Sequence, residues 1–137
     1  MEYPNVPTGI GVGACIVRNN KMLLGRRATN PCKGAWDIIG GFVDPNETLE
    51  MAVRREVQEE IGCRVIKCKY FFSVTEHYFN RQILGVAFLC EIEGEPQSSD
   101  EMSEFQWVSE EIPLAINFNT PKIALKKYFS SSKPSLT

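Results

Sequence analysis

One amphipathic segment near the middle of the chain constrains the fold more than any other feature. Its apolar residues recur at every fourth position, at Leu49, Val53, Val57 and Ile61. This spacing predicts a helix over residues 48–61 with a single buried stripe. Thr48 is a residue type that caps helix starts, and Gly62 suits the left-handed position after a helix end.

Segments with the pattern of β-strands lie on both sides of this helix. Before it, we expect a hairpin, a loop and a short strand, at residues 10–18 with 21–26, 29–34, and 36–39, the last stopping at Gly40-Gly41. After it, we expect two long strands, a polar loop, a short strand and a closing helix, at residues 65–78, 82–93, 94–102, 104–108 and 121–129. Strands before and after a central helix predict an α+β fold, an α/β/α sandwich.

Length and charge limit the class of protein. The 137 residues favour one domain, which we expect over residues 1–130, with a flexible Ser- and Pro-containing tail over 131–137. The formal net charge of −2 argues against a protein that binds nucleic acid chiefly through its phosphates. No apolar run approaches the roughly 18 residues of a membrane span, and residues 1–8 lack the layout of a signal peptide. We therefore expect no membrane partner.

The cysteines are Cys15, Cys32, Cys63, Cys68 and Cys90. Their number is odd, and no pair has the two-residue spacing of a zinc knuckle or a redox motif. We interpret them as packing residues in a protein of the reducing cytoplasm, and we predict no zinc site.

The polar side of the central helix carries three carboxylates. Glu56, Glu59 and Glu60 fall within an arc of about 100° beside the buried stripe. Magnesium prefers such oxygen ligands, together with substrate phosphates. The alternative is a solvated acidic face, which is the better interpretation when the helix is considered alone.

The residues before the helix favour the metal site. Gly40 and Gly41 allow a close approach of the backbone to a ligand. Glu47 adds a carboxylate just before the helix. Upstream, Arg26, Arg27 and Lys33 are cations of the kind that bind phosphates. Together these features indicate a metal-bridged phosphate ester as the ligand.

Two single residues and a run of eight residues, at fixed spacing, complete the pattern. Gly41 is followed by five residues and Glu47, and then by seven residues and the run Arg-Glu-Val-Gln-Glu-Glu-Ile-Gly over 55–62. This arrangement resembles the Nudix box at every charged and glycine position, and the resemblance extends from about residue 9 to residue 129. Two positions depart from it, since Ile39 stands where the family usually has Pro and Cys63 replaces the closing aliphatic residue.

The resemblance implies a fold and an activity. The fold is a Nudix-like mixed β-sheet between helices, with the catalytic loop–helix–loop over Gly41 to Cys63. The activity is hydrolysis of the diphosphate linkage in a nucleoside diphosphate derivative, with Mg²⁺ or Mn²⁺ as cofactor. The expected substrates are small nucleotides: nucleoside triphosphates, ADP-ribose, nucleotide sugars or dinucleoside polyphosphates.

The resemblance also implies roles for residues of the box. Glu56 and Glu60 resemble the main metal ligands, and Glu59 resembles a further ligand or the catalytic base. The carbonyl of Gly40 is expected to face the metal. Arg55 resembles the residue that orients Glu59 or Glu47.

Many Nudix proteins add a carboxylate from a loop beyond the box. Glu101 is our first choice for this catalytic group, with Asp100 and Glu104 as rivals. In some relatives an acidic pair at a comparable place reads the base instead, so Asp100 is also a candidate for substrate binding. A merely solvated loop is an equal alternative.

The candidates for the substrate pocket are weaker. Arg27 and Lys33 are the expected phosphate-binding cations, and Tyr78 and Phe79 are aromatic residues that could stack on a base. Packing of Tyr78 and Phe79 in the core is the favoured alternative. His77, the single histidine, is interpreted as a half-exposed strand residue.

Three functions follow, and the first is the leading hypothesis. A metal-dependent hydrolase requires an intact box, which this chain has, whereas a nucleotide sensor that has lost catalysis would be expected to have a broken one. Hydrolysis at an RNA 5′ end would require a basic groove, for which only Lys122, Lys126 and Lys127 are clustered. Many Nudix proteins are dimers, so a homodimer is also an expectation from the resemblance.

Overall fold

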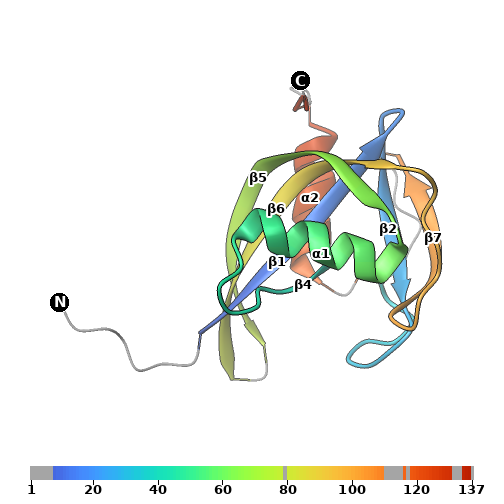
Figure 1. Ribbon diagram of the computed structural model, residues 1–137. Helices are drawn as coiled ribbons and strands as arrows, with labels where there is room; N and C mark the ends of the chain where they lie inside the picture. Colours follow the sequence, from blue (N-terminus) through green and yellow to red (C-terminus); the bar gives the residue numbers. More distant parts are fainter. Residues whose placement is uncertain (1–7, 79, 110–115, 117, 131–133, 137) are drawn as a thin grey trace.

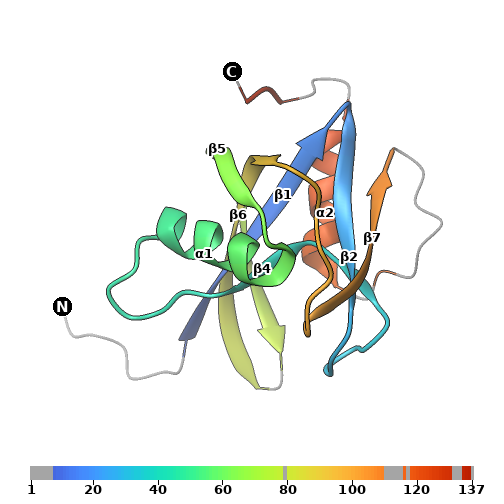
Figure 2. The same cartoon turned by 45° about the vertical axis from the view of Figure 1, so that its right-hand side comes forward.

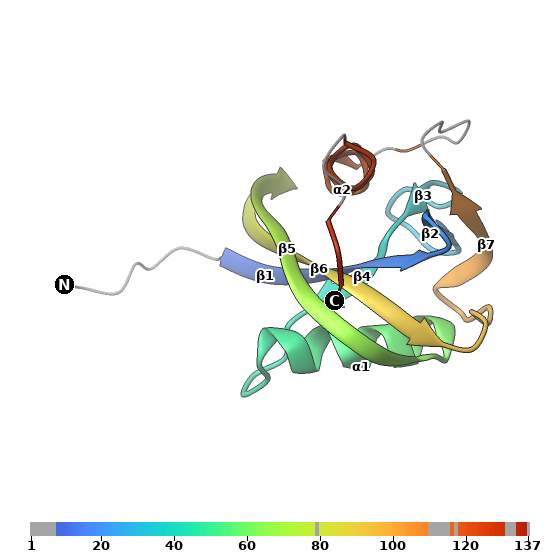
Figure 3. The ribbon, with the colours of Figure 1, turned by 90° about the horizontal axis from the view of Figure 1, so that it is seen from above.

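The computed structural model describes residues 8–78, 80–109, 116, 118–130 and 134–136. In chain order its elements are β1 (Thr8–Arg18), β2 (Lys21–Arg27), β3 (Trp36–Asp37), β4 (Ile39–Phe42), α1 (Leu49–Ile61), β5 (Arg64–Tyr78), β6 (Arg81–Glu93), β7 (Met102–Val108) and α2 (Asn119–Tyr128). Figure 1 and Figure 2 label all of these elements except β3, which is labelled in Figure 3.

Strand β1 joins the two halves of a mixed sheet. The strand order is β3-β2-β1-β6-β5, while β4 also pairs with β1 and β7 also pairs with β2. The first part of β1 pairs with β4, from Gly11 opposite Phe42 to Ala14 opposite Ile39, and its end pairs with β2. Strand β6 lies parallel to β1, and the other pairs are antiparallel. The predicted mixed sheet is therefore confirmed.

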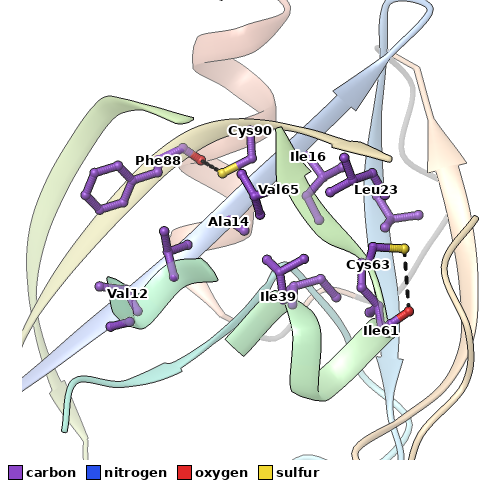
Figure 4. Packing of buried hydrophobic residues seen from close by; sticks show 14 of the residues in the cluster. Val12, Ala14, Ile16, Leu23, Ile39, Ile61, Cys63, Val65, Phe88 and Cys90 are labelled. Carbon is purple, nitrogen blue, oxygen red and sulfur yellow. Dashed lines mark hydrogen bonds between the residues drawn. The ribbon is translucent and has the colours of Figure 1, made fainter. Parts of the chain in front are cut away.

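The two helices cover opposite sides of this sheet, as Figure 3 shows from above. Helix α1 packs its apolar stripe on a cluster that includes Val12 and Ala14 of β1, part of which is drawn in Figure 4. Helix α2 packs on a second cluster that includes Cys15 of the same strand. Successive residues of β1 thus serve the two cores in turn, because side chains alternate along a strand. The predicted α/β/α sandwich is confirmed.

Helix α1 has the boundaries that its sequence predicts. The Oγ1 atom of Thr48 accepts a hydrogen bond from the Met51 N–H at 3.1 Å, and Gly62 takes the left-handed conformation with φ 70°. Val53, Val57 and Ile61 are fully buried, and Leu49 packs partly buried against them. Two carboxylates of the polar side, Glu56 and Glu60, are nevertheless buried as well.

Most other elements agree with the predictions to within two residues. The predicted hairpin turn has positive φ at both Asn19 and Asn20, which suits a tight turn between antiparallel strands. Strand β7 begins two residues earlier than expected, at Met102, and α2 begins two residues earlier, at Asn119. Pro121 therefore lies within the first turn of α2 but is not its first residue.

The prediction of one strand over residues 36–39 that stops at the two glycines is wrong. The segment forms two strands with different partners: Asp37 of β3 lies opposite Gly25, whereas Ile39 of β4 lies opposite Ala14. Strand β4 continues through both glycines to Phe42. A Cβ atom on Gly40 would collide with the carbonyl oxygen of Val12, so glycine here permits the close strand pairing.

The cysteines and the tail differ in how fully the structure describes them. Cys15, Cys63 and Cys90 are buried packing residues as predicted, whereas Cys32 is exposed and Cys68 is half-buried. Of the predicted tail, residues 131–133 and 137 lie outside the described residues, and Leu136 packs against the cluster beneath α2. Within the described part of the chain, neither helix has the length and apolar character needed to cross a membrane.

Candidate active site

Three carboxylates from two distant segments meet beside β4. Glu56 and Glu60 come from α1, and Glu101 comes from the loop just before β7. One oxygen from each of the three lies within 4.8 Å of the others. Glu56 and Glu60 are only 8% and 4% exposed, whereas Glu101 is exposed. Hard oxygen donors without nitrogen or sulfur fit Mg²⁺ or Mn²⁺, so the residues present suit the cation that the sequence predicts.

We call Glu56, Glu60 and Glu101 together the carboxylate group. The electrostatics of these three side chains favour a cation. Burial, together with the neighbouring Glu101 and Glu56 carboxylates, raises the pKa of Glu60 to about 10. Burial also raises the pKa of Glu56, although Arg55 acts in the opposite direction. Negative charges crowded in a partly desolvated place are stabilised by a divalent cation, which favours their ionised form.

The two glycines of β4 hold the carboxylate group close to the sheet. The backbone N–H of Gly40 donates a hydrogen bond to Oε2 of Glu60 at 2.8 Å. A Cβ atom on Gly41 would overlap the carboxylate of Glu56. The structure thus brings the Gly40 amide to the site, and the expected role of its carbonyl toward the metal stays a prediction.

Arg55 ties three carboxylates together. Its guanidinium donates to Glu47 at 2.7 and 3.0 Å, to Glu56 at 2.8 Å and to Glu59 at 3.1 Å. It also donates to the carbonyl of Phe42 at 2.9 Å, which fixes it to the end of β4. The hydrogen bonds to Arg55 are the main cause of the lowered pKa of Glu47. With its donors used in this way, Arg55 is arranged to orient carboxylates.

Glu59 lies apart from the group of three. Its side chain is 56% exposed, and its carboxylate is bound to Arg55 rather than grouped with Glu56 and Glu60. Glu101, by contrast, is held in place by its backbone: its carbonyl accepts from the Ala28 N–H at 2.9 Å and its N–H donates to the hydroxyl of Ser99 at 3.3 Å. Of the two candidates for the base, Glu101 thus belongs to the group of three and Glu59 lies outside it.

The predicted substrate-binding residues are scattered. Arg27 lines a cavity of about 230 Å³ that also includes Gly40 and Gly41. Lys33 and Asp100 are exposed and are not among the described residues that line this cavity. The backbone of Tyr78 pairs with Arg81, but its side chain and the whole of Phe79 lie outside the part of the chain that the structure describes.

Among the residues that line the cavity and that sequence analysis did not assign to it are Asp37, Glu76, Phe118 and Thr120. Glu76 is 8% exposed, and its Oε1 accepts a hydrogen bond from the Thr120 hydroxyl at 2.6 Å. Burial raises the pKa of Asp37 to about 6, while the nearby Arg27 acts to lower it. The sequence does distinguish Glu76 from its neighbours. It lies two residues after Val74, on the inward side of β5, and that side of the strand is otherwise apolar.

Comparisons with known proteins identify the family of the chain. A family model described as NUDIX domain matches residues 7–127. The chain is 32% identical over 118 residues to an ADP-ribose pyrophosphatase of Methanocaldococcus jannaschii, covering 84% of this chain and 66% of that one. It is 35% identical over 116 residues to the NAD-capped RNA hydrolase NudC of Haemophilus influenzae, covering 82% of this chain and 42% of that one. The chain thus spans less than two thirds of each of these relatives.

A solved structure shows the same fold over nearly its whole length. The MutT NUDIX hydrolase from Burkholderia pseudomallei superposes with a TM-score of 0.80 at 29% identity, covering 87% of this chain and 96% of that one. Since the family model matches well over half of the residues, the chain belongs to the NUDIX domain family.

Proposed function

We propose that this chain is a metal-dependent pyrophosphohydrolase that cleaves the diphosphate linkage of a small nucleoside diphosphate derivative. The observation that carries the proposal is the group formed by Glu56, Glu60 and Glu101, which meets next to the cavity. The names of the relatives, an ADP-ribose pyrophosphatase and a hydrolase of NAD-capped RNA, support a substrate with a diphosphate between two larger groups.

In the proposed reaction, some residues of the site would bind the metal ion and others position those ligands. Glu56, Glu60 and Glu101 would hold Mg²⁺ or Mn²⁺, which when bound neutralises phosphate charge and makes the attacking water easier to deprotonate. Arg55 keeps Glu56 and Glu59 in position through its hydrogen bonds. Water attacks one phosphorus, its proton passes to a carboxylate, and the bond from that phosphorus to the bridging oxygen breaks. The products are two phosphate monoesters or, from a nucleoside triphosphate, a monoester and pyrophosphate.

A product assay of the purified protein tests the proposal. The substrates are nucleoside triphosphates, ADP-ribose, nucleotide sugars, dinucleoside polyphosphates and capped RNA, each with Mg²⁺ and then Mn²⁺. The variant Glu60→Gln is the test, and Glu50→Gln is its matched control, because Glu50 is an exposed glutamate of the same helix. Turnover of one substrate class that survives in Glu50→Gln and is lost in Glu60→Gln supports the proposal. A nucleotide that binds but is never cleaved would instead indicate a sensor.

The base is identified by a pair of variants. Glu59→Gln and Glu101→Gln each remove one candidate carboxylate, and the affinity for Mn²⁺ is measured alongside the rate. Removing the base lowers kcat and leaves metal affinity unchanged, whereas removing a metal ligand lowers both. We expect Glu101→Gln to lower Mn²⁺ affinity, since Glu101 is in the group of three and Glu59 is not.

A second substrate is favoured by the similarity to NudC. Capped RNA would leave most of its chain outside the cavity, and the three lysines of α2, Lys122, Lys126 and Lys127, are exposed. Activity on capped RNA that falls steeply with salt, while activity on ADP-ribose does not, would favour RNA as the substrate.

A further inference from the structure

Strand β1 contains a row of alternating glycines that the proposed reaction does not explain. The sequence from residue 9 to 13 is Gly-Ile-Gly-Val-Gly. Because side chains alternate along a strand, these glycines face the same side as Cys15, which packs beneath α2. Gly11 lies directly opposite Gly85 of β6, and Gly13 lies directly opposite Gly40 of β4. All four of these paired glycines line the cavity, and together they form what we call the glycine floor.

Packing requires glycine at only part of this floor. A Cβ atom on Gly13 would lie 2.5 Å from the side chain of Ile38, which is too close. A Cβ atom on Gly11 would come no nearer than 3.7 Å to another atom, and one on Gly85 no nearer than 3.6 Å, which are ordinary contacts. Neither Gly11 nor Gly85 has a positive φ. The fold itself thus tolerates a side chain at Gly11 and at Gly85. Because glycine has no side chain, the space above the sheet at these two positions stays open.

The space above the floor has apolar sides. Ile38, Ile83 and Phe118 line it together with the glycines. The guanidinium carbon of Arg27 lies 5.3 Å from the centre of the Phe118 ring, so an aromatic ring and a flat cation form part of the wall. A flat floor between apolar walls fits a planar ring better than a sugar, whose hydroxyl groups would need partners on every side.

Among the described residues, one polar side-chain atom of this wall has no hydrogen-bond partner. The Oε2 atom of Glu76 is buried and has no hydrogen-bond partner among the described residues, although Oε1 accepts from Thr120. The other acidic residue of the wall, Asp37, is already used, because its oxygens contact the Ile38 N–H at 2.8 Å and Arg27 at 3.4 Å. A buried acceptor without a partner is costly, and a ligand that donates a hydrogen bond to it would remove that cost.

We propose that the cavity binds the nucleobase of the substrate against the glycine floor, and that Glu76 selects bases with an exocyclic amino group by accepting a hydrogen bond from it. The proposal rests on the proposed function, since it assumes a nucleotide ligand. The glycine floor adjoins the carboxylate group at Gly40, whose N–H donates a hydrogen bond to Glu60. A base on the floor would therefore lie next to the site proposed for diphosphate cleavage. Glu76 is then a specificity-determining residue for the reaction.

Equilibrium binding of nucleoside monophosphates in the presence of Mg²⁺ tests the role of Glu76 without any turnover. Three pairs differ at the amino group: adenosine against purine riboside, guanosine against inosine, and cytidine against uridine 5′-monophosphate. We expect the amino member of at least one pair to bind about tenfold more tightly, and this preference to disappear in Glu76→Met, which removes both carboxylate oxygens as acceptors. The matched control is Glu93→Met, at an exposed glutamate of β6 outside the cavity, which should keep the preference. Equal binding within all three pairs, or a preference that survives in Glu76→Met, would overturn the proposal.

The floor is tested by filling it in steps. Gly11→Ala and then Gly11→Val add one and three carbon atoms above the sheet, and Ile10→Val is the control at the neighbouring position on the opposite face. We expect nucleotide affinity to fall about tenfold in Gly11→Val, by less in Gly11→Ala, and not in Ile10→Val. Circular dichroism melting identifies any variant that fails to fold, and Gly85→Ala provides a second site for the same test. Folded Gly11→Val and Gly85→Ala proteins that bind nucleotide normally would contradict the proposal.

Failure of this proposal and failure of the proposed function give different results. If the chain binds nucleotides with the amino preference but cleaves none, the base site stands and the hydrolase does not. If Glu60→Gln abolishes turnover but neither Glu76→Met nor Gly11→Val changes base preference or affinity, the hydrolase stands and the base site does not.

Discussion

The carboxylate group and the glycine-floored cavity adjoin each other but are built in opposite ways. Two of the three grouped carboxylates, Glu56 and Glu60, lie within six consecutive residues of α1 together with Arg55, which orients Glu56. The cavity wall instead takes Asp37, Glu76 and Thr120 from β3, β5 and α2. Helical spacing places Glu56 and Glu60, and only Glu101 reaches the first region through tertiary contacts, whereas the second region depends on the complete tertiary fold. A local pattern can therefore identify most of the carboxylate group, whereas the cavity that we propose to select the substrate depends on long-range contacts.

The largest expected effect separates the two regions. Glu60→Gln should lower turnover by about 10³-fold or more, because the variant removes a charged ligand from the carboxylate group. Nucleotide base preference should be unchanged, since Glu60 does not line the cavity among the described residues. Steady-state kinetics and Mn²⁺ titration measure the two effects. Normal turnover in Glu60→Gln would show that catalysis does not depend on the carboxylate group.

Gly41 and Gly11 should differ in how much an alanine at each position lowers the free energy of unfolding. Gly41→Ala should destabilise the fold by up to about 3 kcal/mol, because its Cβ atom overlaps the Glu56 carboxylate. Gly11→Ala should cost much less, since its Cβ atom meets only ordinary contacts. Urea denaturation of both variants compares the two free energies of unfolding. Equal losses would mean that the two glycines do not differ as described.

Arg55 tests whether orientation matters within the carboxylate group. Arg55→Ala should lower both Mg²⁺ affinity and kcat by about 10–100-fold, because Glu56 loses the group that orients it. Arg55→Lys should recover only part of this, as lysine cannot form the forked contact with Glu47. Calorimetry with Mg²⁺ and a parallel rate assay provide the measurement. An unchanged Mg²⁺ affinity in Arg55→Ala would show that the hydrogen bonds have no effect on the metal.

The smallest expected effect concerns the cavity alone and depends on pH. The folded protein raises the pKa of Asp37 from 3.8 to about 6, so in this range the folded state holds more protons than the unfolded state. Stability should therefore fall as the pH rises from 4 through 6, by about 1–2 kcal/mol from this residue. Asp37→Asn should remove that part of the pH dependence, whereas the exposed Asp100→Asn should not. Melting temperatures from pH 4 to 7 measure it, and identical slopes for the wild type and Asp37→Asn would contradict it.

The sequence predicts helix α1 well because its signals are local. Thr48, the four-residue apolar repeat and Gly62 lie in one continuous segment, and the structure uses each as expected. Local signals could not predict that residues 36–39 belong to two strands. The two strands differ in their partners, since β3 pairs with β2 and β4 pairs with β1, and this pairing is a long-range property. Glu76 was missed for a related reason. Only the folded chain brings it against Thr120, 44 residues later, and shows that one of its oxygens has no partner among the described residues.

The central position of β1 has a consequence for how the chain folds during synthesis. This strand pairs with β2 and β4 from the first third of the chain, but its longest partner, β6, ends at Glu93. Until residue 93 has left the ribosome, one edge of β1 has no strand to pair with, and the apolar faces on both its sides stay incomplete. Parallel pairing across such a separation is slow to form, because the intervening chain must first be ordered. The nascent chain is therefore expected to acquire protection from proteolysis late and all at once.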